Sequence, residues 1–121
     1  MQRVTFAGAL SIAALAVVFV AGVPRAGHAQ DAAAIKKGQQ VYDAQKCSMC
    51  HSVAGKGGKA SALDGVGSKL SAAEIKEWVV DPIAAAKKAN STKKPAMPKK
   101  YDKLPAADID ALVAYMHSLK K

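Results

Sequence analysis

The spacing of apolar residues predicts that the chain is helical after about residue 30. Between Asp31 and the first cysteine, apolar and small residues recur at helical spacing, as on one face of an α-helix. This face carries Ile35, Gly38, Val41 and Tyr42. Asp31 is a suitable N-cap residue, because its carboxylate can accept a hydrogen bond from a free backbone N–H. We therefore expect a first helix that begins at Asp31 and ends near the cysteines.

A second helix is predicted over residues 72–81. It begins with Ser71-Ala72-Ala73-Glu74, a capping-box pattern in which the serine and glutamate side chains satisfy free backbone N–H groups. The pair Asp81-Pro82 ends the helix, because the residue before a proline disfavours helical geometry. The apolar face of this helix carries Ile75, Trp78 and Val79.

The last helix is predicted to open at Leu104-Pro105-Ala106-Ala107-Asp108, where proline suits the first turn and the aspartate lies at the positive end of the helix dipole. Its apolar stripe contains Ile109, Leu112, Val113 and Met116. The glycine-rich residues 53–69 predict a loop. The lysine-rich stretch 83–103 predicts a short alanine helix followed by a methionine between two prolines. No alternating strand pattern is present, so the sequence predicts an all-α fold.

The first 29 residues have the layout of a secretory leader. Arg3 is followed by an uncharged apolar run over residues 6–23, then by Pro24 and small residues that end at Ala29. Cleavage after Ala29 gives a mature domain over residues 30–121. The alternative is an uncleaved membrane anchor, since the apolar run approaches the roughly 20 residues that span a bilayer. In both cases the domain lies outside the cytoplasmic membrane, and we expect a periplasmic protein.

The mature domain is basic and poor in large aromatic residues. Without Arg3 and Arg25, 16 of the 18 basic residues remain against nine acids, for a net charge of about +7. This charge attracts acidic surfaces. Nucleic acid is not an expected partner, because export removes it and no recognition motif accompanies the charge. A domain with one tryptophan and no phenylalanine has a small core, and such domains often need a cross-link, a metal or a cofactor.

The sequence CSMCH at residues 47–51, a CxxCH motif, contains the only two cysteines of the chain. Cysteines at this spacing can form a redox disulfide, provide half of a zinc site, or attach a haem when histidine follows. Structural zinc usually takes four ligands, and only His51 and His117 remain as further candidates. A redox disulfide of this kind is expected beside a βαβ unit, which the sequence does not predict. Haem uses all three residues and agrees with export, so we favour it over a haem-free dithiol or metal-binding protein.

The domain resembles the class I c-type cytochromes, in particular the short bacterial mono-haem proteins, along nearly its whole length. The matching residues, in the family's order, are Gly38 and Tyr42, CSMCH at 47–51, LDGVG at 63–67, EWVVDP at 77–82, AMP at 96–98 and LVAYM at 112–116. The resemblance implies the cytochrome c fold, with three to five helices and loops that wrap one covalent haem. In that fold the first and last helices cross, with Gly38 at the close approach and Tyr115 packed beside it.

The resemblance also implies how the haem is held on one side. Cys47 and Cys50 form thioethers to the porphyrin, and His51 ligates the iron. Members of the family usually carry a proline two residues before Leu63, and its carbonyl accepts the second ring proton of the histidine. This chain has Ser61 at that position. Because every residue has a carbonyl, the hydrogen bond that orients His51 can persist.

On the other face of the iron, the resemblance implies Met97 as the second ligand, within the family's methionine-proline element. Met49 lies between the two cysteines and cannot reach that face, whereas Met116 belongs to the apolar stripe of the last helix. Histidine and methionine together leave no vacant position on the iron, and the thioether raises the reduction potential. Trp78 resembles a tryptophan that packs beside the haem and donates its indole proton toward a propionate. A plain core role is the alternative for Trp78.

These features predict a one-electron carrier that is not an enzyme by itself. Lys93, Lys94, Lys99 and Lys100 flank Met97 and can steer an acidic redox partner, such as a periplasmic dehydrogenase, a membrane oxidase or a cytochrome complex. We expect a monomer that meets membranes only through partners or an uncleaved leader. Two alternatives remain open: a haem subunit of a periplasmic dehydrogenase complex, and a five-coordinate ligand-binding or peroxidatic haem protein.

Overall fold

The computed structural model describes residues 26–121 of the chain, and side chains from Asp31 onward. The leader predicted for residues 1–29 therefore lies almost entirely outside the described residues. The α-helices of the described part are α1 (Ala26–Ala44), α2 (Val66–Lys69), α3 (Ala72–Val80), α4 (Pro82–Lys88) and α5 (Ala106–Ser118). Two 3-10 turns, η1 (Cys47–Met49) and η2 (Tyr101–Lys103), precede the small strands and α5 respectively. None of the described helices combines the length and the apolar character needed to cross a membrane.

Helix α1 begins earlier than the sequence predicts. It starts at Ala26, so Asp31 is an exposed residue inside the helix and the prediction of an N-cap at Asp31 is wrong. Residues 32–34 directly after Asp31 are all alanine, the strongest helix former, and they continue the helix past this position. The predicted end near the cysteines is confirmed, because α1 ends at Ala44.

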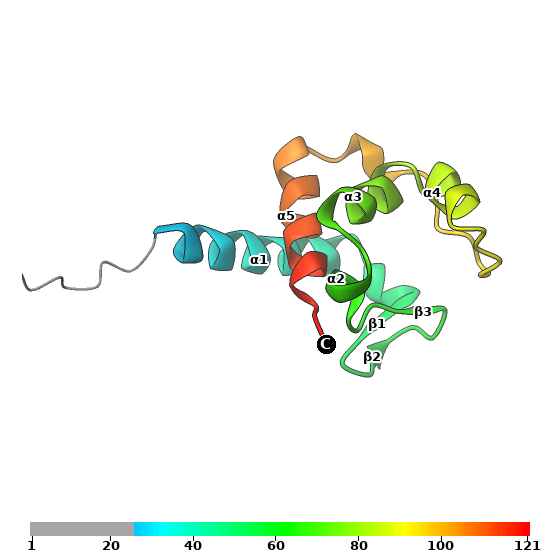
Figure 1. Ribbon diagram of the computed structural model, residues 1–121, viewed down its shortest axis with the longest axis horizontal. Helices are drawn as coiled ribbons and strands as arrows, with labels where there is room; N and C mark the ends of the chain where they lie inside the picture. The colour runs from blue at the N-terminus through cyan, green and yellow to red at the C-terminus, as the bar shows by residue number, and fades with distance from the viewer. Residues whose placement is uncertain (1–25) are drawn as a thin grey trace, which may run out of the picture.

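The core forms where α1 crosses α5 (Figure 1). These two helices make the most extensive contact between elements of the described residues. A Cβ atom at Gly38 would overlap the backbone of Ala111 and lie 2.6 Å from Cβ of Tyr115, so only glycine permits this approach. Tyr42 packs edge-on against Tyr115 with ring centroids 5.6 Å apart. The crossing, with Gly38 and Tyr115 at its centre, is confirmed.

The predicted capping box of α3 is also confirmed. The hydroxyl of Ser71 accepts a hydrogen bond from Glu74 N at 3.3 Å, and Glu74 Oε2 accepts one from Ser71 N at 2.8 Å. Asp81 ends α3 and caps α4, since its Oδ1 accepts from Ala84 N at 3.3 Å. Helix α3 packs on α5, and α4 packs on α3. These two helices extend the crossing of α1 and α5 on one side.

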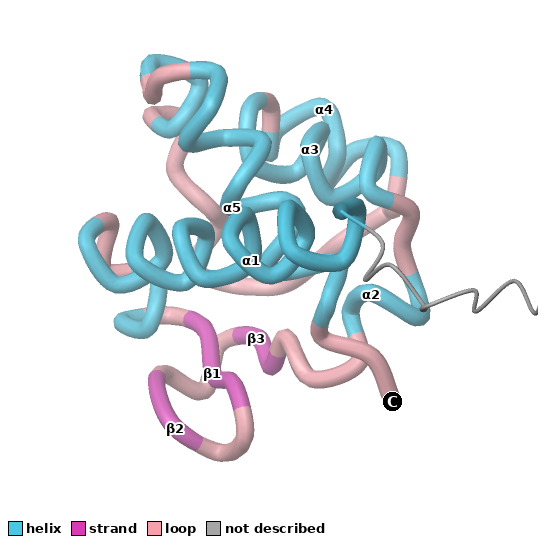
Figure 2. Tube along the Cα trace, turned by 90° about the vertical axis from the view of Figure 1, so that its left-hand side faces the viewer, coloured by secondary structure: helices cyan, strands magenta, loops and turns pink. Residues whose placement is uncertain are grey.

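A small sheet lies on the opposite side of α1 from α3 and α4 (Figure 2). Its strands are β1 (His51–Val53), β2 (Lys56–Gly57) and β3 (Ser61–Ala62), in the order β2-β1-β3. β1 pairs antiparallel with β2 and parallel with β3. The sequence predicts a loop here, and the strands are too short for an alternating pattern to show. The fold class remains all-α, with this sheet and the short helix α2 as additions to the predicted loop.

Candidate functional site

The two cysteines and the histidine lie where α1 has ended and the chain turns into the sheet. Cys47 opens the turn η1 and is half-buried, whereas Cys50 is exposed and both thiols are free. Between them Met49 points into solvent, with 75% of its surface exposed. His51 is half-buried and begins β1. The motif therefore presents two thiols and one imidazole along a single short segment.

The ring of His51 is oriented by the carbonyl group of Ser61, the partner that the sequence predicts. Its Nδ1 lies 3.2 Å from the carbonyl oxygen of Ser61, which the parallel pairing of β1 with β3 places directly opposite. A carbonyl can only accept, so Nδ1 carries the proton and Nε2 keeps a free lone pair. Burial lowers the pKa of His51, against a smaller opposite effect of the Ser61 hydrogen bond. A neutral imidazole with a free Nε2 is the form that ligates a metal.

The backbone around the histidine is held from two sides. The hydroxyl of Tyr42, on α1, donates to the carbonyl oxygen of His51 at 3.3 Å. Gly58 N–H donates to the carbonyl oxygens of Ser48 and His51 at 2.8 and 3.2 Å. A Cβ at Gly58 would overlap the carbonyl oxygen of Met49, so the returning loop can lie this close only with glycine at this position. These contacts fix the motif against α1 and the loop that follows it.

The methionine segment packs on the same core as the motif. Met97 and Cys47 are both half-buried and contact the one hydrophobic cluster of the domain. Tyr101 belongs to this cluster, and burial raises its pKa, with a smaller contribution from the two motif thiols. The segment is tied to the α3–α4 junction by an ion pair between Lys99 Nζ and Asp81 Oδ2 at 3.4 Å.

The remaining methionine and the second histidine take other places. Met116 is 8% exposed and belongs to the core, as the stripe on the last helix predicts. His117 is half-buried rather than fully exposed, because α2 lies against the end of α5. Both residues lie on α5 and not in the segment that holds the CxxCH motif.

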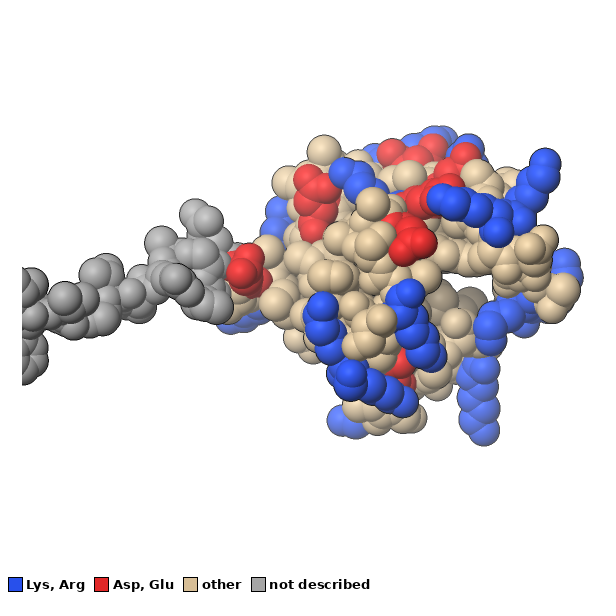
Figure 3. Space-filling view, viewed as in Figure 1, with Lys and Arg blue, Asp and Glu red and all other residues tan. Residues whose placement is uncertain are grey.

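A hollow separates the small sheet from α4 and the segment that follows it. In the view of Figure 1, the space-filling surface opens right through the molecule in this region, and lysine side chains stand around the opening (Figure 3). An adjoining pocket of about 260 Å³ is lined by Leu70, Glu74, Glu77, Trp78, Ala85, Lys88 and Ala89. It contains no residue of the CxxCH motif, and we call this set of residues from Leu70, α3 and α4 the α3–α4 wall.

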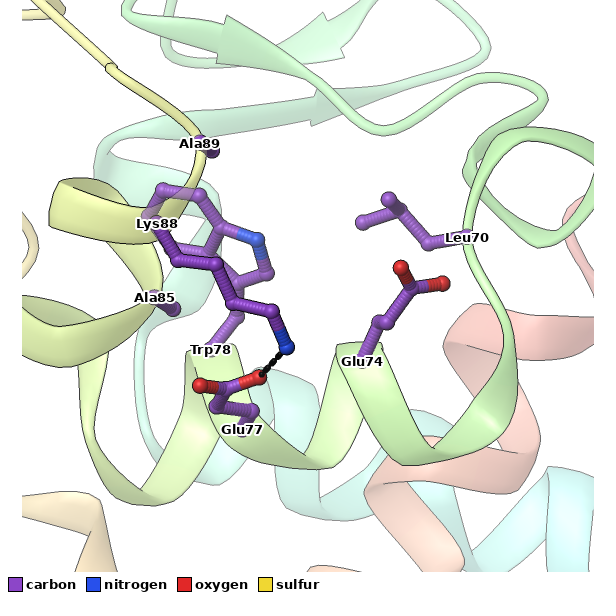
Figure 4. A pocket seen from close by; sticks show the side chains of 7 residues that line it. All are labelled: Leu70, Glu74, Glu77, Trp78, Ala85, Lys88 and Ala89. Atoms are coloured by element: carbon purple, nitrogen blue, oxygen red, sulfur yellow. Dashed lines mark hydrogen bonds and ion pairs between the residues drawn. The ribbon is translucent and has the colours of Figure 1, made fainter.

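Trp78 contributes a free donor to this wall. Figure 4 shows its indole between α3 and α4, with the N–H turned toward the open side of the pocket. Among the residues drawn there, the one hydrogen bond joins Lys88 Nζ to Glu77 Oε2 at 3.1 Å, so the indole N–H has no partner in this group. The indole is half-buried and is not one of the fully buried core residues. Its placement suits a ligand that accepts a hydrogen bond.

The donor set fits a covalently attached haem better than the two alternatives. Within residues 26–121, no three His, Cys, Asp or Glu side chains gather as a metal site would require. Burial raises the pKa of the Cys47 thiol, and the nearby Lys100 only partly offsets this effect. This environment does not activate Cys47 as a thiolate nucleophile. Two free thiols followed by an oriented imidazole fit the covalent attachment of a haem c and a histidine ligand to its iron.

Sequence reasoning did not single out Tyr101 or the ion pair of Lys99 with Asp81. Tyr101 is the only aromatic residue in the lysine-rich stretch and is 8% exposed. An isolated tyrosine among lysines is the one signal that could have marked it. The ion pair joins residues far apart in the sequence and left no local pattern.

Residues 35–120 match the family model described as Cytochrome c. No curated protein and no solved structure is significantly similar to the chain.

Proposed function

Because the chain belongs to the cytochrome c family, a family of haem-binding electron carriers, we propose that it is an exported, monomeric carrier of single electrons. One haem is attached through Cys47 and Cys50, with His51 and Met97 as the axial ligands. The bound haem iron supplies the one-electron redox chemistry. The protein itself provides attachment, ligation and a docking surface, and it is not an enzyme on its own.

The observation that carries this proposal is the arrangement of the motif. Two free thiols precede an imidazole whose Nδ1–H is held by Ser61, so that Nε2 is available as a ligand. The hydrogen bond fixes the ring and raises the basicity of Nε2. Tyr42 and Gly58 hold the backbone of His51, so its ring direction does not depend on the haem alone.

Met97 is the best supported candidate for the second ligand. Of the methionines in the described part, Met49 faces solvent and Met116 is enclosed in the core, whereas Met97 is half-buried and packs on the same hydrophobic cluster as Cys47. Its thioether favours reduced iron and raises the potential. Trp78 complements this arrangement, because its free indole N–H can donate to a haem propionate.

The charge distribution supports docking of a redox partner at the side of the molecule that carries the CxxCH motif and Met97. Residues 44–63 and 82–101 contain nine lysines and no acid, so all nine acids lie elsewhere in the chain. The first stretch holds the cysteine motif, and the second holds Met97 with Lys93, Lys94, Lys99 and Lys100. A positive field on one side steers an acidic redox protein toward that side and speeds the encounter. Such contacts are small and release quickly, as repeated electron transfer requires.

The test uses protein matured in a host that attaches haem c. We expect the pyridine haemochrome spectrum of covalent haem in the parent and a changed or lost spectrum in Cys47→Ala. Met97→Ala should open the sixth position, lower the reduction potential and allow carbon monoxide to bind the ferrous protein.

The matched control is Met49→Ala, which removes an exposed methionine from the same region. It should leave the potential and the response to carbon monoxide unchanged. A parent that carries no haem would overturn the proposal. Rapid carbon monoxide binding by the parent would instead favour the five-coordinate alternative and remove Met97 from the ligand set.

A further inference from the structure

Residues 61–68, which we call the strap, connect the partner of His51 to the end of the last helix. At its first end, Ser61 accepts the hydrogen bond from the ring of His51 at 3.2 Å. Two residues later, Leu63 is buried and its N–H donates to Ser52 O at 2.8 Å. The position of the strap therefore sets the position of the carbonyl that orients the ring.

At its other end, the strap is hydrogen-bonded to the residues that follow α5. Gly67 N–H donates to the carbonyl oxygen of Leu119 at 2.9 Å. Lys121 N–H donates to Ser68 Oγ at 3.1 Å, and the same hydroxyl lies 3.3 Å from the carbonyl oxygen of Lys121. These are three contacts between segments that lie far apart in the sequence.

The fit between the two segments leaves no space for a side chain at Gly67. A Cβ at Gly67 would overlap the carbonyl oxygen of His117 and lie 3.1 Å from its Cα. A Cβ at Gly65 would lie 2.9 Å from Cγ of Lys121. Within the strap, Val66 N–H donates to Leu63 O at 3.0 Å, so the two ends are joined by a short hydrogen-bonded turn. The chain from Gly67 to Ser61 thus runs through this turn and the buried Leu63.

We propose that residues Leu119–Lys121 position the ring of His51 through the strap, with Gly67 and Ser68 as the positioning residues. This inference rests on the proposed ligation of haem iron by His51. A hydrogen bond from Nδ1–H to a carbonyl raises the basicity of the ligating nitrogen and stabilises the ferric state. Loosening the strap should lengthen that bond, weaken the ligand and raise the reduction potential.

The experiment uses the haem-loaded protein and two readouts of the histidine. One readout is the reduction potential, and the other is the rate at which the His51 Nδ1 proton exchanges with solvent, followed by NMR in the ferrous protein. Gly67→Ala should raise the potential and speed the exchange about tenfold, a size typical of lost support behind a metal ligand. Ser68→Ala removes only the hydroxyl contacts and should shift both readouts in the same direction by less.

Two variants separate positioning from general destabilisation. Ser68→Thr keeps the hydroxyl and should restore both readouts to those of the parent. Ile109→Val removes a methyl group from the buried part of α5, away from the strap, and should change stability without changing either readout. If Ser68→Ala and Gly67→Ala keep the potential and exchange rate of the parent while haem and histidine ligation are intact, the strap inference is wrong. A parent without haem would instead overturn the proposed function.

Discussion

At the scale of single residues, Gly38 shows how strictly the helix crossing limits the sequence. The absent side chain lets the backbone of α5 approach α1, and a Cβ there would meet backbone atoms that cannot move aside. The prediction is that Gly38→Ala lowers the free energy of unfolding by about 3 kcal/mol or more, because overpacking against backbone is not relieved by side-chain rotation. Denaturant unfolding of the haem-loaded protein measures this loss.

Gly55→Ala is the matched control for this substitution. Gly55 lies in the turn between β1 and β2 with φ +75°, and a Cβ there would have no atom within 4 Å. Its cost should be limited to the backbone strain of a positive φ, about 1 kcal/mol. Equal losses at Gly38 and Gly55 would contradict the steric explanation of the crossing.

At the scale of elements, α3 depends on its capping box and carries the wall of the site that includes Trp78. Ser71→Ala removes the acceptor for Glu74 N–H and should cost about 1 kcal/mol of stability. Thermal unfolding compared with Thr92→Ala, which removes an exposed hydroxyl outside this box, measures the loss. A cost no larger than that of the control would exclude the cap as a stabilising contact.

The same capping box gives α3 a dependence on pH. The hydrogen bonds from Ser71 N–H and Oγ lower the pKa of the Glu74 carboxyl below its usual value. A carboxylate with a lowered folded-state pKa stabilises the protein above its unfolded pKa, and this contribution disappears as the pH falls through the folded pKa. Glu74→Gln should therefore lose less stability on acidification than the parent. Melting curves at neutral pH and near pH 3 test this, and parallel losses in both proteins would refute it.

At the scale of the whole molecule, the separation of charges makes electron exchange sensitive to salt and to the charge of the partner. Lys93→Gln with Lys94→Gln should slow oxidation of the reduced protein by ferricyanide, an anionic oxidant, at low ionic strength. The same double variant should react faster with a cationic cobalt complex. Both differences should vanish at high salt, because the Debye length shrinks to about 3 Å at 1 M.

The control for this experiment removes the same charge from another part of the chain. Lys36→Gln with Lys69→Gln changes two exposed lysines that lie outside the two acid-free stretches. Stopped-flow rates should differ between the two double variants at low salt. Identical rates with ferricyanide would show that only net charge matters and that docking is not confined to the side with Met97.

The sequence by itself determined α3, α5, the end of α1, the motif and the residue types of the site, because these follow from local spacing and local chemistry. The capping box of Ser71 and the apolar stripe of the last helix are contained in short segments, so they could be read directly. Tertiary structure decided what depends on separate segments meeting: the short helix α2 against α5, the sheet that places Ser61 opposite His51, the burial of Tyr101, and the strap under the end of α5. These contacts are selected by packing of the whole domain, since a two-residue strand or a single carbonyl gains its partner only when distant parts of the chain are already in place.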